Sequence, residues 1–535
     1  MDNEVSQNLN LVPGLNQNLP PEQKFFLRPK FIILILAGIF ILAGLGIGGY
    51  YLLKNNNPTP VSSSTPWPSL PIEASTPLPS SASVGDYSFD ADGFLWGTEA
   101  YMTMMESPNG QKEIDAINNT LKVKNIKVRL YASEKNPTNI VCLGPNCEKK
   151  YDLDAFAKIF KENNWSMRPM FSPAETGPEG PILTDGDIDN YVNYIDWFIS
   201  RYKNDADIKY IELINAPHGF LGDNSKIAGK ITLKQLLDMQ NKVYDRVKSK
   251  YSDIMVGTHG FEYMFDVEPA QALSMVDKGR QLIEYFLDKN NGAKFDYWAF
   301  HGYAAYSSPV QIPTKNKYSG VSGILEIRKK LDANGWQDRF IVDTENVPSS
   351  GPMLSDEQDR IDAAKTLQEL VIKRTLKYNN KFVLSGITPL KIIHRGDAGE
   401  MLWGSLEADS SISQTVKAVS LLWSKLNAYK HISHISGEFG KMDEVWMEKF
   451  QSVSGNKELY IFFRPLPAFE TPAPSNDKIL APLLDKQALS YNLKLNQMPK
   501  SVALTDINGN VKSLTPNQTI ALETINSAKY LEVEY

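Results

Sequence analysis

The sequence predicts an α/β protein, a (β/α)8 barrel followed by a small β-sandwich, preceded by one transmembrane helix and a Pro/Ser/Thr linker. Three observations support this prediction. Strand-like and helix-like segments alternate eight times between about Phe94 and Leu426, short alternating strands follow after about Tyr429, and an uncharged apolar run lies near the N-terminus. Eight strand–helix units are the number that closes such a barrel.

The apolar run Phe31–Leu53 predicts the transmembrane helix. At about 1.5 Å per residue it spans roughly 34 Å, which is enough to cross a bilayer. Lys24, Arg28 and Lys30 precede it and only Lys54 follows closely. Because positive flanks stay in the cytoplasm, we expect a single-pass protein with a cytoplasmic N-terminus and extracytoplasmic C-terminal domains, the lipid bilayer being one partner.

Composition changes divide the rest of the chain. A Pro-, Ser- and Thr-rich stretch (PTPVSSSTPWPSLPIEASTPLPSS) follows the apolar run, and its prolines keep the backbone extended, as in a stalk. The predicted order is a cytoplasmic disordered tail (1–30), a transmembrane helix (31–53), a linker (54–86), a barrel (87–430) and a β-sandwich (431–535).

Short β-rich runs supply eight expected barrel strands. These are Phe94–Thr98, Ile126–Tyr131, Met167–Phe171, Ile208–Asn215, Ile254–Thr258, Phe295–His301, Phe340–Glu345 and Phe382–Thr388. Amphipathic periodicity predicts helices between them. The clearest are Asp152–Asn163, Asp187–Tyr202, Leu233–Ser249, Ser322–Ala333, Glu357–Lys377 and Ser413–Leu426.

The C-terminal region reads as antiparallel sheet. Glu458–Phe463, Ser501–Thr505 and Tyr530–Val533 alternate in polarity, and Asp506–Asn510 (DINGN) is a hairpin turn by its Asn-Gly pair. We expect a β-sandwich here that braces the barrel, with sugar binding as the alternative.

Charge and cysteine content limit the functions open to the chain. A formal net charge of −6 argues against a nucleic-acid partner, which needs a basic face. No spacing of His, Cys, Asp or Glu suggests a metal site, and no phosphate or dinucleotide motif suggests a cofactor. Cys142 and Cys147 fit a small loop-closing disulfide outside the cytosol, and two free thiols are the alternative.

One segment, Ile208–Gly219 (IKYIELINAPHG), is an apolar strand that ends in Asn215-Ala216-Pro217. It resembles the fourth barrel strand of the retaining clan-A glycoside hydrolases, which include families 5 and 39. In that family pattern the triplet is Asn-Glu-Pro and the Glu is the general acid/base. Here Ala216 takes that position, and a methyl group carries no proton. The resemblance covers about residues 90–535 and implies a TIM barrel.

The segment Phe340–Asn346 (FIVDTEN) resembles the family's seventh strand, whose Glu is the nucleophile. That residue is Glu345. Strand alternation would put Ile341, Asp343 and Glu345 on one face, with Glu345 at the rim if that face is the lumen.

The resemblance also implies residues that bind the sugar. Arg129 matches an Arg that holds the nucleophile anionic, and Asn215 matches the Asn that binds the sugar 2-hydroxyl. In DYWAFHGY, His301 and Tyr303 match the residues that contact sugar and nucleophile. Alternation directs Trp298 toward the helices, where it packs.

Two further residues, His218 and Trp403, each have two interpretations, and a third, Glu212, matches the family pattern. His218 replaces a frequent Asn and is either a sugar contact or a loop residue. Trp403 either stacks on sugar or packs, while the eighth strand, FVLSGIT, lacks the Trp usual under the bound sugar. Glu212 matches a Glu that the family often has inside strand four.

Loss of the general acid costs about 10²–10⁴ in rate. Four loop residues could replace it, namely Glu175, His218, Asp223 and Glu262. We therefore expect a membrane-anchored, extracytoplasmic protein that binds an oligo- or polysaccharide and hydrolyses it poorly. The alternatives are an active retaining hydrolase or transglycosidase with a relocated proton donor, and a non-catalytic surface scaffold.

Overall fold

The structure of the chain is a computed structural model. It describes residues 89–100, 102–105, 109–131, 139–143, 149–172, 184–217, 231–262, 270–302, 310, 320–346, 356–389, 412–466 and 484–535. Residues Ser81–Tyr535 belong to one compact unit. The predicted transmembrane helix, the linker and Cys147 lie outside the described residues, as does the side chain of Cys142. No helix in the described ranges has the length and apolar character needed to span a bilayer.

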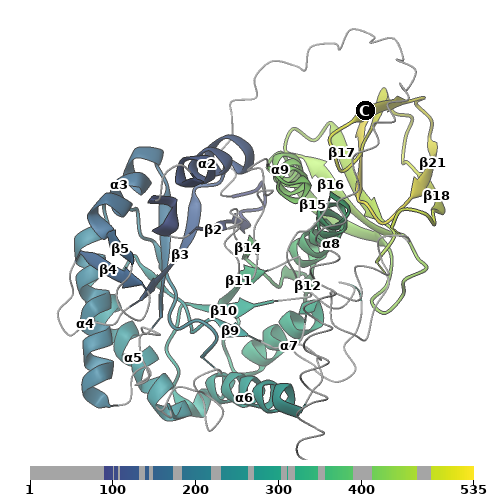
Figure 1. The fold of residues 1–535 in the computed structure, drawn as a ribbon. Coiled ribbons are helices and arrows are strands. Elements are labelled where there is room, and N and C mark those ends of the chain that lie inside the picture. Colours follow the sequence, from purple (N-terminus) through teal and green to yellow (C-terminus); the bar gives the residue numbers. More distant parts are fainter. Residues whose placement is uncertain are drawn as a thin grey trace, which may run out of the picture. The chain divides into compact units, whose positions relative to one another are not determined.

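Parallel strands form a closed ring in the first part of the described chain (Figure 1). In order around the ring they are β1 (Leu95–Trp96) with β2 (Thr98–Ala100), β3 (Asn125–Tyr131), β6 (Ser166–Ser172), β7 (Tyr210–Ile211), β8 (Met255–Val256) with β9 (Phe261–Glu262), β10 (Tyr297–His301), β11 (Phe340–Asn346) and β14 (Gly386–Pro389). Ladder pairings and two single bridges, Met170–Glu212 and Gly257–Tyr297, connect each strand to the next, and β14 pairs with β1. The described strands thus make the eight-stranded barrel that the sequence predicts.

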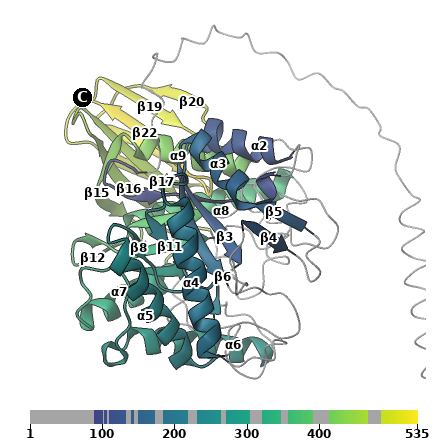
Figure 2. The same cartoon turned by 90° about the vertical axis from the view of Figure 1, so that its left-hand side faces the viewer.

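Helices cover the outside of the ring, with α4 and α5 running along it in Figure 2. They are α2 (Asn109–Asp115), which continues into a π-helix (Ala116–Leu121), α3 (Leu153–Asn163), α4 (Asp185–Tyr202), α5 (Leu233–Lys250), α6 (Ala270–Leu287), α7 (Gly320–Ala333), α8 (Asp356–Thr375) and α9 (Gln414–Leu426). Capping boxes begin α4 at Thr184 and α5 at Thr232, because each hydroxyl accepts a hydrogen bond from the backbone N–H three residues on.

Two strand predictions need correction. The expected strand Ile208–Asn215 is continuous only at Tyr210–Ile211, because Glu212 and Asn215 pair with their neighbours at single bridges. In the expected strand Phe382–Thr388, Phe382 belongs to a separate hairpin, β12 (Lys377–Tyr378) with β13 (Lys381–Phe382), so the eighth barrel strand starts at Gly386. The hairpin of β4 (Ile140–Leu143) and β5 (Lys149–Asp152) is an addition that the sequence pattern does not single out.

Two antiparallel sheets follow the barrel. The larger has the order β15 (Tyr429–Ser436), β16 (Trp446–Ser452), β17 (Lys457–Phe463), β22 (Lys529–Glu534), β19 (Ser501–Thr505) and β20 (Val511–Leu514), and the smaller pairs β18 (Leu489–Lys494) with β21 (Thr519–Thr524). Apolar side chains of both sheets share one core, among them Phe462 and Ile520. The predicted hairpin turn is confirmed, because β19 pairs with β20 and Asp506 Oδ1 accepts from the backbone of Asn508 and Asn510.

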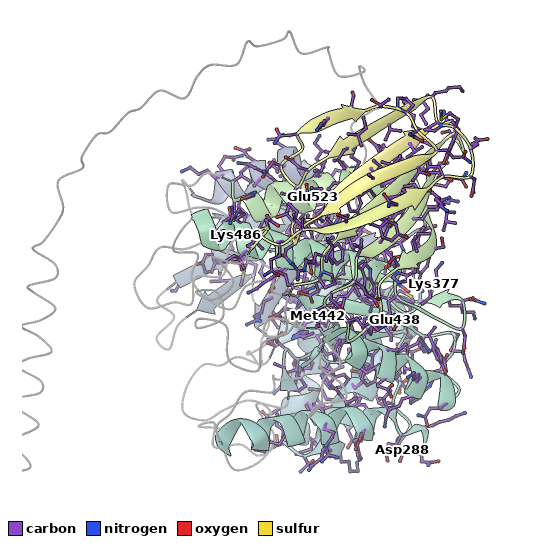
Figure 3. The ribbon with its side chains drawn as sticks, turned by 90° about the vertical axis from the view of Figure 1, so that its right-hand side faces the viewer. Asp288, Lys377, Glu438, Met442, Lys486 and Glu523 are labelled. Atoms are coloured by element: carbon purple, nitrogen blue, oxygen red, sulfur yellow. The ribbon has the colours of Figure 1, made fainter. Side chains whose placement is uncertain are left out.

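Buried polar contacts join α8 and α9 to the sandwich. The Gln368 side-chain amide donates to the carbonyls of Arg464 (3.0 Å) and Asn526 (2.7 Å), and Lys425 pairs with Glu532 at 2.7 Å. Figure 3 shows the segment with Glu438 and Met442 beside the barrel helices, and Gly440 of this segment donates to the Val310 carbonyl at 2.6 Å. The sandwich is therefore fixed to the two barrel helices that follow the last strands.

Candidate active site

The barrel strand β11 changes its alternation just before Glu345. Ile341 joins the core shared with the helices, and Val342 packs inside the ring with Tyr297 and Ala299. Asp343 turns outward and Thr344 inward, where its hydroxyl donates to Glu212 at 2.9 Å. The expectation that Ile341, Asp343 and Glu345 share one face was wrong.

A shift in register explains how Glu345 still reaches the interior. Asp343 pairs with Ile387, and Asn346 pairs with Pro389. Between these two pairs β11 advances by three residues while β14 advances by two, so β11 contains one extra residue. Such a bulge lets two successive side chains point to the same side. Thr344 and Glu345 are those two residues, and the Glu345 side chain keeps 10% of its surface exposed.

Two cations, a histidine and one amide surround Glu345. Its Oε2 lies 3.3 Å from Lys127 Nζ, 3.7 Å from Arg129 Nη2 and 3.8 Å from His301 Nε2. Lys127 and Arg129 are two residues apart on β3, so both point inward. With its amide oriented to satisfy both groups, Asn215 donates to Glu345 Oε2 at 3.2 Å and accepts from Arg129 at 2.9 Å.

Glu212 lies below this group and is fully buried. Its Oε1 is 3.5 Å from His301 Nε2 and 3.9 Å from Lys127 Nζ. Gly260 makes this approach possible, because a Cβ there would lie 2.4 Å from His301 Nε2 and 2.6 Å from Glu212 Oε1. Only glycine leaves room for the buried pair.

The pKa values in the group reflect this charge arrangement. Burial raises the pKa of Glu212, but Lys127, His301 and Arg168 outweigh burial and hold that pKa below its usual range. For His301, burial lowers the pKa, while Glu345 and Glu212 raise it by more, so the net shift is upward. These shifts favour the anionic form of Glu212 and the protonated form of His301.

Ala216 follows directly after Asn215 at the end of this strand. It is half-buried, its N–H donates to the Gly260 carbonyl at 3.0 Å, and its φ is +45°. A residue with a Cβ pays about 1 kcal/mol for this left-handed conformation. The backbone at this position is therefore strained while carrying only a methyl group.

The structure brings together four of the predicted site residues, Arg129, Asn215, His301 and Glu345. It describes neither the other predicted sugar contacts nor the side chains that could replace the acid. These predictions therefore stay predictions for His218, Tyr303, Trp403, Glu175, Asp223 and Glu262. Trp298 packs outward against Phe261 and Phe295, as predicted.

Sequence reasoning missed Lys127 and Thr344. Lys127 had a readable signal, because it stands two residues before Arg129 in an otherwise apolar strand and must share its face. Thr344 had none, because the bulge that turns it inward is invisible in the sequence. Among the described residues, no group of His, Cys, Asp and Glu side chains is placed to hold a metal ion.

No protein-family model and no curated protein matches the sequence. Solved structures do match, and they define the class: an α/β fold of the kind found in glycoside hydrolases of family 39. A family 39 glycoside hydrolase from the gut symbiont Bacteroides cellulosilyticus WH2 is 16% identical, with a TM-score of 0.56 over 82% of this chain and 80% of that chain. A monomeric beta-xylosidase from Caulobacter crescentus CB15 is 12% identical, with a TM-score of 0.55 over 84% and 97%. At these identities the likeness establishes the fold.

Proposed function

We propose that the protein binds an oligo- or polysaccharide at the mouth of the barrel and has lost efficient hydrolysis. The observation that carries the proposal is a single buried group, in which Glu345 is held by Lys127, Arg129 and Asn215. The very next residue after Asn215 is Ala216, at the position where the similar glycosidases have their proton donor.

The chemistry follows from what is present and what is absent. Glu345 is the nucleophile that attacks the anomeric carbon and forms a glycosyl ester, as in retaining hydrolysis. The departing oxygen must then leave as an alkoxide, because Ala216 supplies no proton. Water that hydrolyses the ester also lacks a base. Glycosides whose leaving group is another sugar therefore react slowly, while glycosides with acidic leaving groups form the ester quickly and hydrolyse it slowly.

The polar groups of the site fit a sugar ligand. Arg129, 20% exposed, Asn215 and Glu345 supply charged and neutral hydrogen-bonding atoms at the mouth. In this proposal Asn215 binds the 2-hydroxyl, and His301, Tyr303, His218 and Trp403 complete the contacts.

Membrane anchoring through Phe31–Leu53, with the barrel and the sandwich outside the cytoplasm, belongs to the same proposal. Its test is fractionation of cells that express the full chain. The protein should stay in the membrane after alkaline washing, and a variant without residues 1–54 should not. Recovery of the full chain in the wash would overturn the anchoring.

Activity on aryl glycosides tests the site. We expect a rapid burst of phenol equal to the enzyme concentration and a slow steady rate, which azide or formate raises because these anions attack the glycosyl ester without a base. The wild-type protein should bind sugars on a glycan array, and the Glu345→Gln variant should bind the same sugars more weakly. Efficient turnover of natural oligosaccharides would instead favour a relocated proton donor, and the absence of both burst and glycan binding would favour a scaffold.

A further inference from the structure

The inward direction of Glu345 depends on the bulge in β11, and a bulge needs support. Within the described part of the strand, Asp343 is the last residue that pairs with β14 before the register shift, and Asn346 is where that pairing resumes. Both side chains leave the barrel on its outer side, toward α8. Whatever holds these two residues also sets where the Glu345 carboxylate points.

Two residues of α8, one turn apart, hold both ends of the bulge. Lys373 Nζ donates to Asp343 Oδ2 at 2.7 Å and also pairs with Glu369. Glu369 in turn is hydrogen-bonded by the Asn346 side chain. Lys373 and Asp343 are fully buried, and Glu369 is 3% exposed. The chain from Asp343 through Lys373 and Glu369 to Asn346 therefore spans the bulge from behind.

The same group fixes the residue that follows His301. Lys373 donates to the Gly302 carbonyl, and the Gly302 N–H donates to Asp343 Oδ1 at 3.0 Å. A Cβ on Gly302 would lie 2.7 Å from Asp343 Oδ2, so the backbone fits directly onto the ion pair. The ends of β10 and β11 are thereby joined, and with them His301 and Glu345, which meet inside the ring at 3.8 Å.

The surroundings favour the charged form of Lys373. Burial lowers the pKa of Lys373, but Asp343 and Glu369 outweigh burial and raise that pKa. Burial raises the pKa of Glu369. A buried pair of this kind is costly to break, because the remaining charge stays without its partner in a dry interior.

We propose that Lys373 and Glu369 are positioning residues for Glu345: they hold the two ends of the bulge that directs the carboxylate into the barrel mouth. The inference rests on the proposed role of Glu345 as nucleophile. Lys373 does not touch the ligand site itself. Removing it should misdirect the attacking carboxylate and so slow its reaction much more than it weakens sugar binding.

Covalent labelling of Glu345 tests this inference. A panel of dinitrophenyl 2-deoxy-2-fluoro-glycosides traps the glycosyl ester, and mass spectrometry of peptides identifies the labelled residue. In Lys373→Met we expect the labelling rate constant to fall about 10²-fold, the size expected for a reacting group displaced by about 1 Å. The inhibitor concentration for half-maximal rate should change little, because the mouth of the site is intact.

The neighbouring Arg374 provides a matched control. It lies on the same helix, is 1% exposed, and pairs with Asp90 and Asp92 on the side of the sandwich, each at 2.5 Å. Arg374→Met therefore breaks a buried ion pair of similar kind without touching the bulge. Its stability should fall comparably while its labelling rate stays near wild type. Equal slowing in both variants would overturn the proposal, since it would mark a general loss of order.

A second pair of variants decides the matter if Lys373→Met does not fold. Glu369→Gln keeps an oxygen for Asn346, whereas Glu369→Ala removes it. We expect labelling near wild type in the first and slow labelling in the second, and equal rates would overturn the inference. If wild type is labelled at Glu345 and Lys373→Met equally fast, only this inference fails. If no reagent labels wild type, the proposed function fails and the inference falls with it.

Discussion

Two buried groups of the molecule combine histidine with glutamate, and they are built differently. In the sandwich, Glu448 accepts short hydrogen bonds from His431 (2.9 Å), His434 (2.8 Å) and the Trp446 indole (2.9 Å). In the barrel, the ion-pair contacts of Glu345 to Lys127, Arg129 and His301 are 3.3–3.8 Å long.

In our proposal, this difference separates a structural group from a functional one. Short bonds from three donors occupy most of the acceptor positions of the buried Glu448 carboxylate, and such bonds stabilise a fold. The described cations lie farther from Glu345, at 3.3–3.8 Å, and its side chain keeps 10% of its surface exposed. The comparison predicts that changes in the barrel group alter chemistry, whereas changes in Glu448 alter stability alone.

The largest expected effect tests whether the barrel group can catalyse hydrolysis once a proton donor is added. Ala216→Glu restores a proton donor opposite Glu345, and hydrolysis of unactivated oligosaccharides should rise by about 10²–10⁴ in rate. Steady-state kinetics with the glycan found on the array provides the measurement. Ala216→Gln is the matched control, since it has the same shape and no proton to give. A folded Ala216→Glu protein without gain would show that position 216 does not face the leaving group.

Removal of Lys127 tests whether the loose contacts still stabilise the barrel. Lys127→Met removes the buried cation that Glu212 and Glu345 share, and we expect the free energy of unfolding to drop by about 3–5 kcal/mol. Urea denaturation measures the change. Lys457, which pairs with Glu534 on the surface of the sandwich at 3.4 Å, is the control, and Lys457→Met should cost less than about 1 kcal/mol. Similar losses in the two variants would contradict the importance of burial.

The smallest effect concerns Glu448. Glu448→Gln removes the charge that His431 and His434 share, and should cost about 1.5–3 kcal/mol of stability with no change in glycan binding or in Glu345 labelling. Altered binding in this variant would break the proposed division between the two groups.

The same variant has a pH signature. Burial lowers the pKa of His434, but Glu448 outweighs burial and raises that pKa above 6.5. A raised pKa contributes stability that is complete below the unfolded value and lost as the pH rises through the folded value. Wild-type stability should therefore decline from near-neutral to mildly alkaline pH, and Glu448→Gln should show a shallower decline in urea titrations.

Much of the barrel could be predicted from the sequence because each strand is a short apolar run between periodic helices. The convergence of Arg129, Asn215, His301 and Glu345 was also predictable, since all four end parallel strands, whose carboxyl ends meet at one rim. The bulge was not, because two inward residues in succession depend on the register against β14. The contacts of Lys373 and Glu369 with β11 could not be predicted either. In the sequence these two residues of α8 resemble an ordinary surface ion pair one turn apart, and only the position of the helix against β11 shows their role.

The left-handed turn at Ala216 bears on how a barrel of this kind could lose its chemistry and keep its backbone. The loop that would present a proton donor keeps its demanding shape, anchored to Gly260, although a methyl group has nothing to present. If the proposed loss of hydrolysis is correct, the backbone of the site has been kept after its proton donor was lost. In that case a comparison of backbones alone would group this chain with working enzymes, and the side chain at position 216 would tell them apart.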